Sequence, residues 1–147
     1  MGLHLIIGNK NYSSWSFRPW LAMKVTGIAF EETMLPLDAP DFKARLAAFG
    51  GAGKVPLIID GETRVWETLA FLEYLAERFP AAGLWPREPA ARAHARAIAA
   101  EMHCGFSSLR SRLPMNIRRL GVSARSGDQL TLDRYAIRLC SSSSSGC

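Results

Sequence analysis

A valine–proline pair directly before a short apolar run is the feature that most limits how this chain can fold. The segment Gly53-Lys54-Val55-Pro56 leads into the apolar residues 57–59. Proline has no N–H to give to a strand ladder, so a sheet accepts Pro56 at the start of a strand where a cis peptide bond after Val55 turns the chain sharply. The sequence therefore predicts a cis proline at the entrance to a strand.

The residues Trp66-Glu67-Thr68-Leu69 predict the start of a helix shortly after that strand. The Glu67 carboxylate and the Thr68 hydroxyl would lie beside backbone N–H groups that have no partner within the helix, and such a helix start binds anions. A kinked peptide next to an anion-binding helix start predicts a docking site for a small peptide with a free carboxylate.

The pattern of apolar, capping and turn residues predicts an alternation of strands and helices. Strands are predicted at residues 3–7, 28–35, 56–59 and 63–66, and helices at residues 13–27, 41–49 and 68–79. The order β-α-β-α-β-β-α, with the Val-Pro turn before the third strand, predicts a thioredoxin-like fold of the α/β class. The apolar face of the helix at 68–79 is expected to consist of Leu69, Leu72, Leu75, Ala76 and Phe79. Residues 90–113 are predicted to form a single long helix.

Composition and charge exclude several classes of protein. The chain has 147 residues, enough for one core, and its net charge of +5 is local, because residues 87–119 carry seven Arg against two Glu. No aromatic residues alternate with these arginines as in a nucleic-acid-binding module, so we expect a solvated helix face or an anionic substrate there and no nucleic-acid partner. No apolar run reaches the roughly 18 residues of a membrane span.

The cysteines and the N-terminus predict a cytoplasmic protein. The three cysteines, Cys104, Cys140 and Cys147, are widely spaced and odd in number, so neither a disulfide framework nor a metal site is expected. The first four residues carry no basic segment of the kind that begins a signal peptide.

Three separated motifs together resemble the N-terminal domain of the glutathione S-transferase family. They are the loop at residues 11–20 with its Ser-Ser-Trp-Ser tetrad, the segment at 53–56, and the helix start at 66–75. The tetrad is most similar to the zeta-type and related bacterial members. The resemblance covers residues 3–86 and continues into residues 101–116, which are similar to the first helix of the family's all-α C-terminal domain.

The resemblance implies a division of the chain into three parts. Residues 1–80 would form the thioredoxin-like glutathione-binding domain, and residues 81–119 the first helix of the helical domain. In the family this helical domain continues as a bundle that supplies most of the hydrophobic substrate pocket. Residues 120–147 lose apolar periodicity and end in a serine run, so we expect them to be a disordered or aberrant tail, as in a truncated or frame-shifted gene.

The resemblance places the catalytic role on Ser13, with Ser14 as the alternative. A free thiol has a pKa of about 8.5, so little of it is thiolate at neutral pH. A serine hydroxyl at a helix start can donate to the sulfur, and the helix dipole favours its negative charge. The same serines are also good helix caps, and capping alone remains the competing interpretation.

Five further residues are implied to bind glutathione. Val55 would pair its backbone with the cysteinyl unit as an added strand, in a geometry that Pro56 enforces. Glu67 would hold the γ-glutamyl ammonium, and Thr68 the adjacent carboxylate. Lys54 could reach the glycyl carboxylate, although a solvated lysine explains it equally well.

Other residues near these motifs receive structural interpretations. The tetrad lacks the cysteine that thiol–disulfide exchange on this fold requires, so a reductase is not expected. Trp15 and Trp20 are expected to pack, and Arg18 to link the first helix to its loop. His103 and Met102 could face an electrophile pocket, but a lone histidine on a helix is more often solvated or satisfied in the core.

The sequence therefore predicts a cytoplasmic glutathione transferase of the detoxification type, with glutathione as co-substrate, a small electrophile as second substrate and no metal. A zeta-like cis–trans isomerase and a non-catalytic glutathione-binding remnant are the alternatives. Self-association into a homodimer is left open. Neither a membrane nor a nucleic acid is expected as a partner.

Overall fold

The computed structural model describes residues 2–51 and 53–120, and the chain forms two compact units, Met1–Gly105 and Phe106–Cys147. The first unit contains the sheet and the helices that pack on it. The domain boundary predicted near residue 80 stays a prediction. The tail predicted for residues 120–147 lies, from residue 121 onward, outside the described residues.

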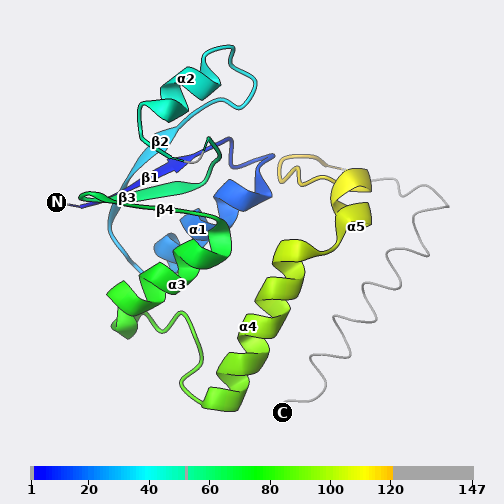
Figure 1. Ribbon diagram of the computed structural model, residues 1–147. Helices are drawn as coiled ribbons and strands as arrows, with labels where there is room; N and C mark the ends of the chain where they lie inside the picture. The colour runs from blue at the N-terminus through cyan, green and yellow to red at the C-terminus, as the bar shows by residue number, and fades with distance from the viewer. Residues whose placement is uncertain (1, 52, 121–147) are drawn as a thin grey trace. The chain divides into compact units, whose positions relative to one another are not determined.

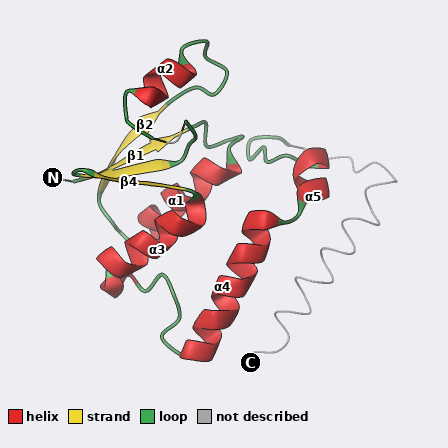
Figure 2. Ribbon diagram, viewed as in Figure 1, coloured by secondary structure: helices red, strands yellow, loops and turns green. Residues whose placement is uncertain are grey.

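A mixed sheet of four strands forms the centre of the first unit (Figure 2). The strands are β1 (Leu3–Ile7), β2 (Phe30–Met34), β3 (Leu57–Asp60) and β4 (Thr63–Trp66), in the spatial order β2-β1-β3-β4. Strand β1 pairs in parallel with β2 and antiparallel with β3, which pairs antiparallel with β4. Four strands were predicted from the sequence in these places, and all four are confirmed.

Helices fill the connections as the sequence predicts. They are α1 (Ser14–Val25) between β1 and β2, α2 (Phe42–Ala47) between β2 and β3, and α3 (Thr68–Arg78) after β4. A short 3-10 helix, Pro80–Ala82, follows α3. The order β-α-β-α-β-β-α is therefore confirmed, and the fold is thioredoxin-like.

The alternation of side chains along β1 divides the core into two layers. Figure 1 shows α1 and α3 on one side of the sheet and α2 on the other. Leu3, Leu5 and Ile7 pack with Met23 of α1 and with α3 on one face of the sheet. Ile6 points to the other face and packs with a smaller cluster that includes Leu46 of α2. Because successive side chains of a strand point to opposite faces, a strand covered on both sides is mainly apolar, and the polar residue of β1 is the half-buried His4.

The buried face of α3 differs from the face that the sequence analysis predicted. Thr68, Phe71 and Leu75 are the buried residues of this helix, whereas Leu69 and Leu72 are only half-buried. Phe71 is fully buried in the larger core cluster and was absent from the predicted stripe. The helix is thus turned so that Thr68, at its first position, also faces inward.

The single helix predicted for residues 90–113 is wrong, because the chain forms α4 (Pro89–Cys104) and α5 (Ser107–Arg112) instead. A side chain at Gly105 would place its Cβ 2.8 Å from the Glu101 carbonyl oxygen, so a glycine is needed there. Phe106 then adopts a φ of 62°, in the left-handed region, and the helical path ends.

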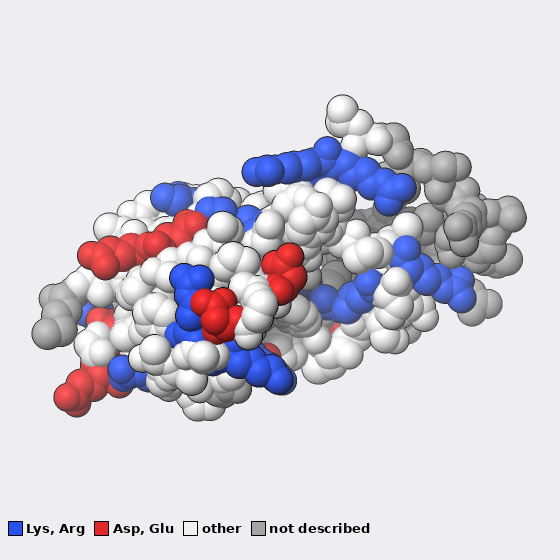
Figure 3. Space-filling view, turned by 90° about the horizontal axis from the view of Figure 1, so that it is seen from above, with Lys and Arg blue, Asp and Glu red and all other residues white. Residues whose placement is uncertain are grey.

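Ion pairs cover parts of the surface of the first unit, and Figure 3 shows places where acidic and basic side chains lie next to each other. Arg96 of α4 holds Glu73 of α3 with two hydrogen bonds of 2.8 and 2.9 Å. Part of the local positive charge at residues 87–119 is therefore used to join α4 to α3. Among the described residues, no helix is long and apolar enough to cross a membrane.

We predict that Phe71→Ala will lower the free energy of unfolding by about 3–5 kcal/mol, because it leaves a cavity in the larger core cluster. Leu21→Ala is the matched control, since Leu21 is 42% exposed and its truncation should change stability by less than about 1 kcal/mol. Urea denaturation followed by circular dichroism measures both. Equal effects of the two substitutions would contradict the assignment of Phe71 to the core.

A second prediction concerns the carboxyl group of Asp60 at the end of β3. The Tyr74 hydroxyl donates to Asp60 Oδ2 at 2.8 Å, and this bond, helped by Arg78, lowers the pKa of the carboxyl group. Tyr74→Phe should raise the Asp60 pKa toward its ordinary value. A carboxyl group whose pKa is lowered by folding stabilises the folded protein at pH values above its pKa in the unfolded chain, about 3.9. This stabilisation is lost below about pH 3.9, as the pH falls through the pKa of the folded state. Carboxyl NMR titration of both proteins tests this, and an unchanged Asp60 pKa would contradict it.

Candidate functional site

A cavity of about 230 Å³ lies where the loop before β3 meets the starts of α1 and α3. It contains all five residues predicted to bind a ligand, and one that was expected only to pack. The residues lining it are Trp15, Lys54, Val55, Pro56, Glu67 and Thr68. Segments that are far apart in the sequence thus meet at one site, as the family resemblance implied.

The two predicted catalytic serines lie at the start of α1 and are not among the lining residues. Ser13 is the N-cap residue, and its hydroxyl oxygen accepts a hydrogen bond from the Ser16 N–H at 3.3 Å. Ser14 is the first residue of the helix and is half-buried. The capping role that the sequence analysis weighed against catalysis is therefore present at Ser13. Catalysis by either serine stays a prediction.

Ser16 connects the start of α1 to the end of β1. Its side chain is fully buried, and its hydroxyl oxygen accepts from the Gly8 N–H at 2.9 Å and lies 2.9 Å from the Ser13 hydroxyl. A hydroxyl group can donate one hydrogen and accept through two lone pairs, so Ser16 can serve both neighbours at once. This chain of contacts fixes the Ser13 side chain relative to the sheet.

The peptide bond between Val55 and Pro56 is cis, as predicted. Strand β3 begins only at Leu57, which lies opposite Ile6 of β1 and Trp66 of β4. The backbone of Val55 therefore lies beyond the last paired position of the ladder. The Val55 side chain packs against the smaller core cluster, and this packing holds the residue at the border of the cavity.

Glu67 has an unusual backbone conformation at the start of α3. Its φ is 66° and its ψ is 122°, values that a residue with a side chain rarely adopts. The side chain makes no capping hydrogen bond to the helix. Strain of this kind is found where the surrounding structure enforces it, often at binding sites. In Glu67 it leaves the carboxylate beside the cavity instead of folded back onto the helix.

The group of Thr68 that is available to a ligand anion is its backbone N–H and not its hydroxyl hydrogen. The hydroxyl donates to the Trp15 carbonyl oxygen at 3.3 Å, and the residue is 3% exposed. The first hydrogen bond of α3 runs from the Phe71 N–H to the Glu67 carbonyl, so the N–H groups of residues 68–70 have no acceptor within the helix. Donors for an anion at this helix start are therefore backbone N–H groups.

Trp15 forms a wall of the cavity, which the sequence analysis did not predict. The Arg18 guanidinium lies over its ring, 4.3 Å from the centroid, and the His103 ring meets it edge-on at 5.1 Å. Trp15 lies in a serine-rich helix start without apolar periodicity, so the sequence could not show whether its ring lines a cavity or packs in the core. Arg18 thus contacts the ring that borders the site.

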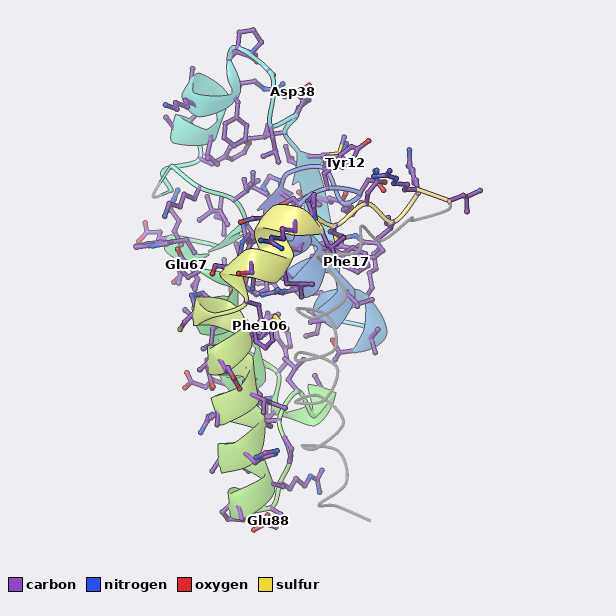
Figure 4. All side chains as sticks on the ribbon, turned by 90° about the vertical axis from the view of Figure 1, so that its right-hand side faces the viewer. Tyr12, Phe17, Asp38, Glu67, Glu88 and Phe106 are labelled. Atoms are coloured by element: carbon purple, nitrogen blue, oxygen red, sulfur yellow. The ribbon has the colours of Figure 1, made fainter. Side chains whose placement is uncertain are left out.

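His103, in the last turn of α4, also reaches the edge of the site. Its Nε2 atom lies 3.6 Å from the Glu67 carboxylate. Figure 4 shows Glu67 beside the end of α4 that lies opposite Glu88. His103 was not among the predicted site residues, because a lone histidine on a helix is more often solvated or satisfied in the core. Its contact with Glu67 depends on how α4 lies against α3, which no local pattern reports.

The charges at the cavity are mixed, and they suit a zwitterionic ligand. Lys54 supplies a cation and Glu67 an anion, and the N-terminus of α3 adds a partial positive charge. Within residues 2–51 and 53–120, no group of three or more metal-ligating side chains is found. What the site can do is hold a small molecule with both charges next to Val55, which lies just beyond the paired ladder of the sheet.

Comparisons with known proteins match the part of the chain that contains these residues. Residues 12–78 match the family model of the glutathione S-transferase N-terminal domain. A probable maleylacetoacetate isomerase of Caenorhabditis elegans is 36% identical over 98 residues, covering 66% of this chain and 45% of that protein. The maleylacetoacetate isomerase of Rhizobium meliloti is 38% identical over 88 residues, covering 58% and 41%. The chain therefore spans less than half the length of these relatives.

A solved structure gives the same fold. A glutathione transferase homolog from Burkholderia, crystallised with bound glutathione, has a TM-score of 0.62 to this chain at 24% identity. The match covers 76% of this chain and 58% of that one. At this identity the likeness concerns the fold.

We predict that Glu67→Gly will be more stable than Glu67→Ala by about 1 kcal/mol, because relief of backbone strain of order 1–3 kcal/mol exceeds the entropic cost of glycine, about 0.5–1 kcal/mol. The matched pair Glu77→Gly and Glu77→Ala, inside α3, should show the opposite order by about 1 kcal/mol. Urea denaturation measures all four variants. If glycine is the less stable residue at both positions, Glu67 is not strained.

Proposed function

Since the chain belongs to the glutathione S-transferase family through the N-terminal domain at residues 12–78, we propose that it binds glutathione in the cavity beside α3 and acts as a glutathione transferase. The observation that carries the proposal is the meeting, in one cavity, of Val55, which lies beyond the paired ladder, the N-terminus of α3 and the Glu67 carboxylate. The first suits the cysteinyl unit, and the other two, which both lie at the start of α3, suit the γ-glutamyl end.

The γ-glutamyl end of glutathione carries an ammonium and a carboxylate on one carbon. The backbone N–H groups at the start of α3 suit the carboxylate, since they have no acceptor within the helix. Glu67 suits the ammonium, because its carboxylate is the acidic group among the lining residues. The Thr68 N–H is one of the groups that suit the carboxylate. Because the Thr68 hydroxyl donates its hydrogen to Trp15, its oxygen can only accept a hydrogen bond, which suits the ammonium.

The cysteinyl unit pairs with Val55 in the manner of an added strand. An extended peptide adds to a sheet where a backbone N–H and C=O lie beyond the paired ladder, which is the position of Val55. Pro56 follows with the cis bond that bends the chain at this point. Lys54 lies in the same cavity and suits the glycyl carboxylate at the other end of the tripeptide.

Ser13 activates the thiol in this proposal, and Ser14 is the alternative. The Ser13–Ser16 hydrogen bond can reverse its direction by rotation of the two hydroxyl groups, since each oxygen can donate or accept. Ser16 then donates to Ser13, and the Ser13 hydrogen turns to the sulfur while the Gly8 N–H still donates to Ser16. The helix start adds a favourable field for the thiolate.

The reaction transfers the glutathionyl group to a small electrophile. The thiol proton passes to solvent, the sulfur electron pair forms a bond to carbon, and a leaving group such as a halide departs with the electron pair of its own bond. This chain would supply the activation of the thiol. A small electrophile as second substrate and a place in detoxification belong to the same proposal, whereas self-association into a homodimer is left open.

Two alternative functions use the same glutathione site. A glutathione-dependent cis–trans isomerase is favoured by the two relatives described as maleylacetoacetate isomerases, at 36% and 38% identity. In that reaction the thiolate adds to a double bond and leaves after rotation, so glutathione is regenerated. A binding protein without catalysis is the other alternative. Turnover of an aryl halide, turnover of a cis-dienoate, or binding without either distinguishes the three.

Glutathione binding is the first prediction of this proposal. Titration calorimetry of the full chain should show saturable binding, and amide NMR shifts should cluster at Ser13, Val55, Glu67 and Thr68. Glu67→Gln should weaken binding about tenfold, equivalent to about 1.4 kcal/mol, because it removes the charge that faces the ammonium. Glu62→Gln, on the hairpin turn outside the cavity, is the matched control. A folded chain that does not bind glutathione would refute the proposal.

The thiol pKa is the second prediction. We expect the bound glutathione thiol to have a pKa about two units below the free value, a stabilisation of the thiolate by about 2.7 kcal/mol. Ser13→Ala should return the pKa most of the way to about 8.5, whereas Ser14→Ala should change it little. Ultraviolet absorbance of the thiolate against pH measures both. The reverse result would move the role to Ser14, and a normal pKa in the wild-type complex would favour the binding protein.

A further inference from the structure

The last turn of α4 contributes a histidine to the edge of the glutathione cavity. His103 Nε2 lies 3.6 Å from Glu67 Oε2, and the His103 ring packs edge-on against Trp15, which lines the cavity. The His103 side chain is 29% exposed and that of Glu67 is 47% exposed. A ring held by a wall of the cavity thus faces the one carboxylate of the cavity.

The surroundings of the imidazole indicate which nitrogen carries the hydrogen. Nδ1 is buried and has no hydrogen-bond partner among the described residues, whereas Nε2 faces a carboxylate. A buried N–H group without an acceptor is costly, and a carboxylate can only accept. The Nε2–H tautomer satisfies both conditions, because it directs the hydrogen at Glu67 and leaves a lone pair at Nδ1.

Glu67 needs such a partner more than most surface glutamates do. Its side chain makes no bond to the helix that it precedes, and its strained backbone directs it away from that helix. A long side chain that is half exposed populates several rotamers, and fixing it on binding a ligand loses conformational entropy. A donor at its outer oxygen limits those rotamers before the ligand arrives.

The distance of 3.6 Å is longer than an ordinary N–H···O hydrogen bond of about 2.7–3.2 Å. Contacts at ligand-free sites are often loose and shorten in the complex. The contact therefore leaves the second carboxylate oxygen, Oε1, available to a cation while Oε2 is directed at His103.

We propose that His103 is a positioning residue, which holds the Glu67 carboxylate in the orientation that receives the ammonium group of the γ-glutamyl unit. This inference rests on the proposed glutathione site and deepens it, because it makes recognition of the ligand's amino group depend on α4. Glu67 is the group that touches the ligand, and His103 acts through it.

The test compares glutathione with an analogue that lacks the α-amino group, in which the glutamyl unit is replaced by glutaryl. Titration calorimetry is run on the full chain and on His103→Ala, His103→Gln and His94→Ala, each checked for folding by circular dichroism. His94 is exposed on the same helix and is the matched control. Glutamine can place an N–H near the position of Nε2, so it is the conservative variant.

We expect His103→Ala to weaken glutathione binding about tenfold, while the amino-free analogue binds wild type and variant alike. His103→Gln should bind glutathione within about twofold of wild type, as should His94→Ala. A loss in His103→Ala that is equal for both ligands would mean that the ring only supports the packing of Trp15, and it would overturn the inference. Unchanged glutathione binding in His103→Ala, or no recovery in His103→Gln, would also overturn it.

Failure of the proposed function gives a different result. If the wild-type chain binds neither ligand, the glutathione site itself is refuted, and the inference falls with it. If the wild type binds glutathione and the His103 variants fail these contrasts, the inference alone is refuted. Imidazole ¹⁵N shifts of the ligand-free chain give an independent readout: the Nε2–H tautomer is expected for His103, and the Nδ1–H tautomer would contradict the proposed contact.

Discussion

The burial of β1 on both faces is the constraint on which the rest of the structure depends. Leu5, Ile6 and Ile7 are fully buried, and their alternation places α1 and α3 on one face and α2 on the other. Each element that borders the cavity is connected to this strand, paired with it or packed against it. The loop to α1 leaves its C-terminal end, and β3, which begins just after Pro56, pairs with it. Packing of one apolar strand therefore fixes the parts of the candidate site relative to one another.

The polar link from Gly8 through Ser16 to Ser13 carries this rigidity to the start of α1. Ser16 is buried without exposure, and a buried hydroxyl needs partners to offset the loss of its bonds to water. Meeting that requirement orients the Ser13 hydroxyl in the absence of any ligand. Stability and site geometry therefore depend on the same hydrogen bonds here, and capping by Ser13 is compatible with a chemical role.

Local signals in the sequence predicted the strands, the cis proline and the N-cap, and the family resemblance implied five ligand-binding residues, all of which line the cavity. Each depends on a short stretch whose conformation follows from its own residues. The misses have another origin. Phe71 is buried because α3 is rotated by its packing on the sheet, and the break after Gly105 depends on a close approach to the Glu101 carbonyl. Trp15 and His103 belong to the site through contacts between helices, which no local periodicity reports.

The contributions of α3 and α4 to the site suggest how its two tasks divide along the chain. All six residues that line the cavity lie within residues 12–78, the span of the family match. A ligand's backbone and carboxylate can therefore be held by the sheet, the loop before β3 and the start of α3 alone. The Glu67 carboxylate, in contrast, is contacted by His103 of α4, outside that span, and we propose that this contact orients it. If recognition of the amino group depends on α4, selectivity among glutathione-like peptides can change without altering the thioredoxin-like core, because α4 is attached to α3 mainly through surface contacts such as Arg96–Glu73.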